Sequence, residues 1–196
     1  MLTRACHHRQ VWWFYTVILG MAFGQVLQEL AIAMRDWRNE TRRPFAPAML
    51  WQVFLLALIV QVWLAVTFYR DTVTVISILE LVAFLAVPAA ILIMSFLMPD
   101  STHDPQHDAA TAFNRVRPLF FGVLIAMIAV NLLHGFLIGQ LGLDLDLLFQ
   151  CLMIAGAVCG LLLRRTRADS WLAVTMTLIV LTYIALGYST VEVGAP

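Results

Sequence analysis

Apolar residues occur along this chain in long, nearly continuous blocks, separated by short stretches that hold most of the charged residues. An α-helix needs about 20 mostly apolar residues to cross the hydrocarbon core of a bilayer, and the blocks are close to that length or longer. The pattern therefore predicts six membrane-spanning helices. Their expected ranges are Val11–Met34, Ala46–Tyr69, Thr72–Met98, Pro118–Gln140, Leu145–Leu163 and Trp171–Ser189.

Composition agrees with this pattern. Of the 196 residues, 62% are hydrophobic and 12% are charged, whereas a soluble domain averages about 45–50% and about 25%. We expect an all-α integral membrane protein in which residues 1–196 form one six-helix transmembrane domain surrounded by lipid. The longest connection between blocks, 99–117, is predicted to be a cytoplasmic loop that is too short to form a soluble domain, with a short surface helix at its end as an alternative.

The first block also has features of a secretory signal peptide. Arg4 and Arg9 precede an apolar core, and the small residues at 31–33 resemble a cleavage site. The block is long for a signal peptide, however, and it carries polar residues that have counterparts later in the chain. A first spanning helix is therefore favoured, with a signal peptide as the alternative.

Arginine supplies every fixed positive side-chain charge, because the chain contains no lysine. The connections after the first, third and fifth blocks hold nine arginines, and the remaining flanks hold three. The positive-inside rule then places both termini outside the cytoplasm. We expect a plasma membrane protein, and an arginine-rich, lysine-free composition favours a bacterial inner membrane. The net charge is zero, which gives no indication of a nucleic-acid partner.

Histidine and cysteine do not indicate a cofactor. The segment "HDPQHD" at 103–108 places two histidines four residues apart, but Pro105 disfavours the helix that would bring them together. Zinc sites need three or four convergent ligands, so we predict no metal. Cys151 and Cys159 are about 12 Å apart along one helix, which is too far for a disulfide.

A weak internal repeat suggests how the helices are organised. Aligning the chain from Arg9 with the chain from Arg115 places Gln25 on Asn131 and Gln28 on His134. The units would span 9–98 and 115–189 with three helices each, and would therefore insert in opposite directions. Inverted repeats of this kind occur in many transporters, which bind their substrates where the repeats meet.

Polar residues inside the blocks are the candidate functional residues. By depth they form an outer group of Gln61, Glu80, Asn131 and His134, and an inner group of Gln25, Gln28 and Glu29, to which Gln52 is a further candidate. A carboxylate inside a membrane is costly unless it is paired or hydrated. With its helix beginning at Thr72, Glu80 would lie about 12 Å from the outer end, at a depth close to that of His134. We therefore predict that these two form a proton-exchanging pair. The alternative is that such side chains form hydrogen bonds that hold neighbouring helices together.

Three classes of function follow. The favoured hypothesis is a transporter or channel for a small solute or ion, coupled to protons through Glu80 and His134. The alternative is a structural or regulatory subunit, because Gly156 and Gly160 form a GxxxG-like pair suited to close helix contact, with a second copy or another membrane protein as partner. An enzyme is the third class and is not expected, since no catalytic motif is present.

Overall fold

The computed structural model is entirely helical where it is described, which covers residues 2–38, 45–70, 77–98, 109–138, 145–163 and 166–188. Each of its six helices is long and apolar enough to cross a membrane, so the predicted all-α, six-span membrane class is confirmed. The helices are α1 (Leu2–Arg38), α2 (Ala46–Arg70), α3 (Ile78–Leu97), α4 (Ala109–Ile138), α5 (Leu145–Leu162) and α6 (Thr166–Gly187).

Four helix starts differ from the sequence prediction. α1 begins at Leu2 and not at Val11, and α6 begins at Thr166 and not at Trp171. The start of α3 changes the interpretation of Glu80. Ser77 is the N-cap of α3 and has an extended backbone, so the helix begins at Ile78 and not at Thr72. Its side chain accepts a hydrogen bond from the backbone N–H of Glu80, and the Glu80 carboxylate accepts one from the backbone N–H of Ser77. This reciprocal arrangement is a capping box, which satisfies two N–H groups that a helix start would otherwise leave unpaired.

The fourth helix starts earlier than predicted. It begins at Ala109 and continues through Pro118, so 109–117 belongs to the helix and not to a cytoplasmic loop. Residues 99–108 lie outside the described residues. Proline is tolerated within membrane helices because neighbouring groups can satisfy the freed backbone carbonyl. Pro88 lies inside α3 in the same way, as predicted.

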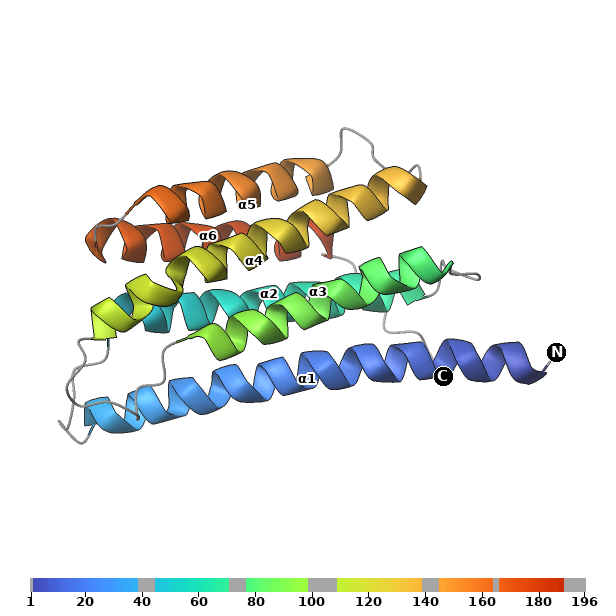
Figure 1. Ribbon diagram of the computed structural model, residues 1–196, viewed down its shortest axis with the longest axis horizontal. Coiled ribbons are helices and arrows are strands. Elements are labelled where there is room, and N and C mark those ends of the chain that lie inside the picture. The colour runs from blue at the N-terminus through green and yellow to red at the C-terminus, as the bar shows by residue number, and fades with distance from the viewer. Residues whose placement is uncertain are drawn as a thin grey trace.

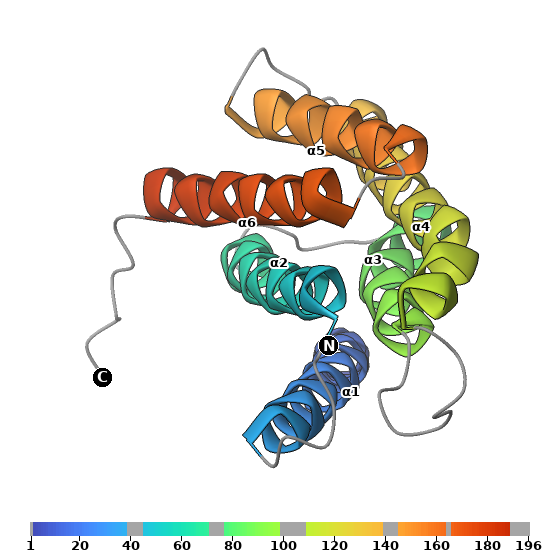
Figure 2. The same ribbon diagram turned by 90° about the vertical axis from the view of Figure 1, so that its left-hand side faces the viewer.

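The helices run back and forth along one common direction (Figure 1). Viewed from one end, α2 lies between α1 and α6, and α3 lies between α1 and α4 (Figure 2). α5 packs against α4 and α6. The packing of α1 against both α2 and α3 favours a spanning helix over the alternative of a signal peptide.

Aromatic residues fill the bundle between α2 and α4. The ring of Trp51 lies 5.0 Å from that of Phe121 and 5.6 Å from that of Phe120, measured between centroids. All three side chains are completely buried. Aromatic pairs in such edge-to-face arrangements add about 0.5–1.5 kcal/mol to the energy of burial.

The helix packing gives no support to the inverted repeat. The repeat would relate α1 to α4, α2 to α5 and α3 to α6. The extensive contact of α2 with α6 would then require a matching contact of α5 with α3. In the same way, the contact of α3 with α4 would require a matching contact of α6 with α1. Neither counterpart is among the substantial helix contacts of the described residues.

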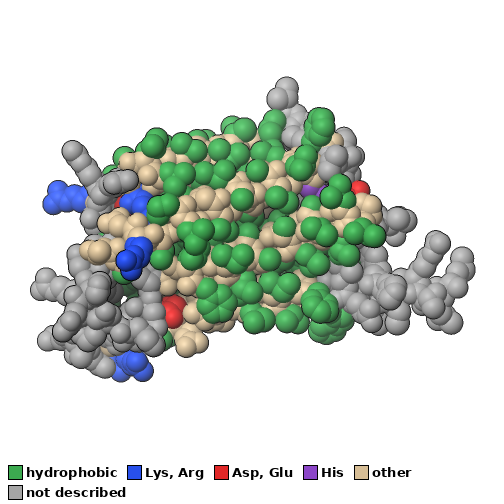
Figure 3. Space-filling view, in the orientation of Figure 1, with side chains coloured by type: hydrophobic (Ala, Val, Ile, Leu, Met, Phe, Trp, Pro, Cys, Tyr) green, Lys and Arg blue, Asp and Glu red, His purple; other side chains and the backbone are tan. Residues whose placement is uncertain are grey.

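Large apolar side chains on the outside of the bundle face the space that lipid would occupy. Hydrophobic atoms cover the middle of the face in Figure 3, with arginines near one end and a histidine near the other. Exposed residues such as Trp13, Phe14 and Phe136 belong to this surface. It is the surface expected of a protein in a lipid bilayer.

Candidate functional site

A cavity of about 500 Å³ lies inside one end of the bundle. All six helices contribute to it, α1 through Tyr15 and α6 through Tyr183. Its polar lining consists of Gln61, Asn131, His134, Asp146, Gln150, Tyr183 and Tyr188. Small-molecule sites have volumes of about 300–1,000 Å³ and combine apolar walls with a few polar groups, as this cavity does.

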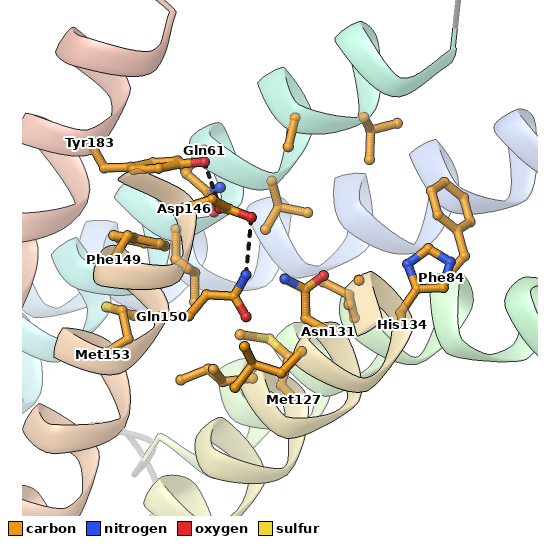
Figure 4. Close-up of a pocket in the computed structure, with 18 of the residues that line it drawn as sticks. Gln61, Phe84, Met127, Asn131, His134, Asp146, Phe149, Gln150, Met153 and Tyr183 are labelled. Atoms are coloured by element: carbon orange, nitrogen blue, oxygen red, sulfur yellow. Dashed lines mark hydrogen bonds between the residues drawn. The ribbon is translucent and has the colours of Figure 1, made fainter. Parts of the chain in front are cut away.

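Asp146 is the centre of the hydrogen bonding in the cavity (Figure 4). One of its carboxylate oxygens accepts a 2.8 Å hydrogen bond from the Tyr183 hydroxyl, and the other accepts a 3.1 Å bond from Nε2 of Gln150. Asp146 is in the first turn of α5, where the positive end of the helix dipole favours a carboxylate. These two donors hold the carboxylate in one orientation and leave part of its accepting capacity unused.

Gln150 also has a buried oxygen without a partner among the described residues. The residue is only 7% exposed, and its Oε1 has no hydrogen-bond partner among the described residues. A buried polar atom in this state costs about 1–3 kcal/mol. The oxygen has almost no accessible surface, so the contribution of Gln150 to the cavity is its hydrogen bond to Asp146.

Aromatic rings form much of the cavity wall. The rings of Phe149 and Tyr183 are stacked with centroids 4.1 Å apart, and Tyr15 lies 4.4 Å from Phe84. Tyr188, just beyond the end of α6, meets Tyr183 edge to face. Burial raises the pKa of the Tyr188 hydroxyl, so this group stays protonated at neutral pH.

Three of the predicted residues come together in this cavity. Gln61 from α2 and both Asn131 and His134 from α4 line it. Glu80 does not, because it lies in the first turn of α3 and its carboxylate caps the helix at Ser77. It is near enough to His134 to interact with it electrostatically. Its place at the helix start differs from the predicted depth, since α3 begins later than the sequence pattern indicated.

The predicted inner group lies away from the cavity. Nε2 of Gln25 donates to Oε1 of Glu29 over 3.5 Å, one helical turn apart. Gln28 points outward and is exposed. Glu29 is buried, as is Gln52 of the neighbouring helix α2. The structure therefore brings Gln25 and Glu29 together and leaves Gln28 apart from both.

Gly156 and Gly160 serve contacts within the chain. A Cβ atom at Gly156 would collide with the side chain of Met176 on α6, and one at Gly160 would collide with the ring of Phe121 on α4. The predicted close helix contact is thus present between α5 and its own neighbours. This packing accounts for the glycine pair without a partner protein.

A buried ion pair between α4 and α6 was missed by the sequence analysis, which assigned Arg117 to a cytoplasmic loop. Its NH2 group donates to Asp169 over 2.9 Å, and its Nε donates to the carbonyl of Gly160 over 2.7 Å. The side chains of Arg117 and Asp169 are only 5% and 2% exposed. The guanidinium also lies 5.6 Å from the centre of the Phe121 ring. Arg117 therefore connects three helices.

The arginines with described side chains lie at the end of the bundle opposite the cavity. The arginines whose side chains are described are near the last turns of α1 or the first turns of α4 and α6, whereas the cavity is formed by the opposite halves of these helices. They are Arg35, Arg38, Arg115, Arg117 and Arg167. Among the described side chains, arginine is therefore found at one end of the bundle only.

Within the described part of the chain, no group of three or more His, Cys, Asp or Glu residues could hold a metal ion. The histidines of 103–108 are outside that part. Cys151 and Cys159 are free thiols. No family model, curated protein or solved structure matches the chain.

Proposed function

We propose that this protein is a transporter that binds a small polar solute in the cavity around Asp146. The observation that carries the proposal is a cavity of about 500 Å³, lined by polar groups, within a bundle whose outer surface is apolar. Gln61 and Asn131 interrupt the apolar stretches of α2 and α4, and polar groups inside a membrane are costly and often mark the path of a substrate or ion.

The arrangement of charge suggests from which side a solute enters. Arginine-rich ends of membrane proteins face the cytoplasm, and the cavity is at the other end. The solute would then bind from outside a plasma membrane, in keeping with a bacterial inner membrane protein. Passage to the cytoplasm requires the end near Arg117 and Asp169 to open, because Trp51, Phe120 and Phe121 close the bundle there.

Proton coupling remains part of the proposal in a modified form. The ionisable side chains of His134 and Asp146 line the cavity, and that of Glu80 does not. Glu80 caps α3, and glutamine at the same position can keep the capping box. We therefore expect Glu80→Gln to retain transport.

The test is uptake into proteoliposomes of four radiolabelled solutes, namely choline, glucose, glutamate and phosphate. Ala83→Phe places a large ring in the cavity wall, since Ala83 lines the cavity. Ala129→Phe is its matched control, because Ala129 is exposed on the outside of α4. Protein-dependent uptake of at least one solute should be lost in Ala83→Phe and kept in Ala129→Phe and Glu80→Gln.

The proposal is wrong if none of the four solutes enters faster than into empty liposomes, or if Ala83→Phe and Ala129→Phe transport equally well. The alternative of a structural or regulatory subunit would then be favoured. Loss of uptake in Glu80→Gln alone would restore the proton pair of Glu80 and His134 as the coupling site.

A further inference from the structure

The charged groups of the cavity favour one sign of solute. Among its described lining residues, Asp146 is the only acidic side chain, and no arginine contributes to the lining. The chain has no lysine, and the arginines with described side chains are at the other end of the bundle. Among the described lining residues, His134 on α4 is the only one that can carry a positive charge. An anion would therefore meet the Asp146 carboxylate without a fixed positive charge beside it.

The walls of the cavity suit a cation with apolar substituents. Phe149 and Tyr183 line the cavity beside Asp146, whereas Phe84 lines it on the side of His134, with Tyr15 packed against Phe84 (Figure 4). Aromatic rings attract ammonium groups through their electron-rich faces, and several rings around one site are a common way to hold alkylated ammonium ions. A carboxylate next to such rings adds charge complementarity.

Gln150 supports the position of the carboxylate. Its Nε2 donates to Asp146 from one turn further along α5. Figure 4 shows Gln150 and Asp146 side by side, with Asn131 facing them from α4.

We propose that the cavity selects small organic ammonium compounds, held by the Asp146 carboxylate and the neighbouring rings of Phe149 and Tyr183. This inference rests on the proposed function, because it names the class of solute that the same cavity takes.

The test compares cations with neutral molecules of the same shape. The purified full chain in lipid nanodiscs is titrated with choline and with its neutral isostere 3,3-dimethyl-1-butanol, then with ethanolamine and 1-propanol, using calorimetry. Acetate and phosphate are the anionic probes. At least one ammonium compound should bind about tenfold or more tightly than its isostere, and neither anion should compete.

Asp146→Asn should remove this preference, since the amide keeps the shape and loses the charge. Glu80→Gln is the matched control, because it removes a carboxylate at the same end of the bundle but outside the cavity lining. It should keep the preference for cations.

The inference fails if each isostere binds as tightly as its ammonium partner, if an anion binds more tightly, or if Glu80→Gln and Asp146→Asn have equal effects. The comparison of isosteres uses the unmodified protein, so it stands even if Asp146→Asn does not fold. Cavity-dependent uptake of glucose without any preference for ammonium would overturn the inference and leave the proposed function intact.

Discussion

Among individual residues, Arg117 and Asp169 have the largest expected effect on stability. Both are almost completely buried and joined at 2.9 Å. Removing one partner of a buried pair leaves the other charge uncompensated, which costs about 3–5 kcal/mol. We expect Arg117→Met and Asp169→Leu each to lower the free energy of unfolding by about this amount, and the double variant to be less destabilised than the sum of the two.

Unfolding in mixed detergent micelles measures these differences. Arg115→Met is the control, since Arg115 is exposed two residues away and its replacement should change stability by no more than about 0.5 kcal/mol. Equal effects of Arg115→Met and Arg117→Met would contradict a structural role for the pair.

At the same scale, sequence analysis identified the polar residues inside the membrane but not their partners. Gln61, Asn131 and His134 stand out because they interrupt apolar blocks. The hydrogen bond between Asp146 and Gln150 could have been predicted from their spacing, because residues four apart meet on one helix face. Arg117 and Asp169 are 52 residues apart, and no local pattern relates them.

Among the elements, α5 depends most on small residues. An added Cβ at Gly160 would meet the ring of Phe121, which is rigid and fully buried, whereas at Gly156 it would meet the flexible side chain of Met176. We expect Gly160→Ala to destabilise the protein by about 1–3 kcal/mol through overpacking, and Gly156→Ala to destabilise it less. Thermal unfolding in detergent would measure both.

Gly122 on α4 is the matched control, because a Cβ there would meet nothing within 4 Å. Alanine is the better helix former by about 1 kcal/mol, so Gly122→Ala should be neutral or stabilising. If all three variants were equally stable, the close contacts of α5 would not matter for the fold.

The starts of α3 and α4 show which helix boundaries can be predicted from the sequence. The run from Ser77 to Glu80 has the spacing of a capping box, so the start of α3 was present in the sequence but was outweighed by the continuous apolar pattern. The start of α4 was harder to predict. Arg115, Arg117 and Pro118 suggest a helix boundary, and only the pairing of Arg117 with another helix explains why α4 continues through them.

For the whole molecule, hydrophobic blocks determine how many times the chain crosses a membrane, because span length is set by bilayer thickness. They contain little information about which helices become neighbours, since nearly every face is apolar. The repeat suggested by Gln25 and Asn131 illustrates the difference. One of these residues hydrogen-bonds within its own helix and the other lines the cavity, and the helix contacts do not follow the expected symmetry.

Orientation in the membrane is the remaining property of the whole molecule that the sequence predicts. Arg117 is neutralised by Asp169, so the count of nine arginines against three becomes eight against three, and the bias persists. An alkaline phosphatase reporter, active only outside the cytoplasm, should be active when fused at the C-terminus and inactive when fused after Met98. A fluorescent protein that matures only in the cytoplasm should give the opposite pattern at both positions. If the fluorescent protein were active at the C-terminus, the cavity would face the cytoplasm. The proposed transporter would then bind its ammonium solute from inside the cell.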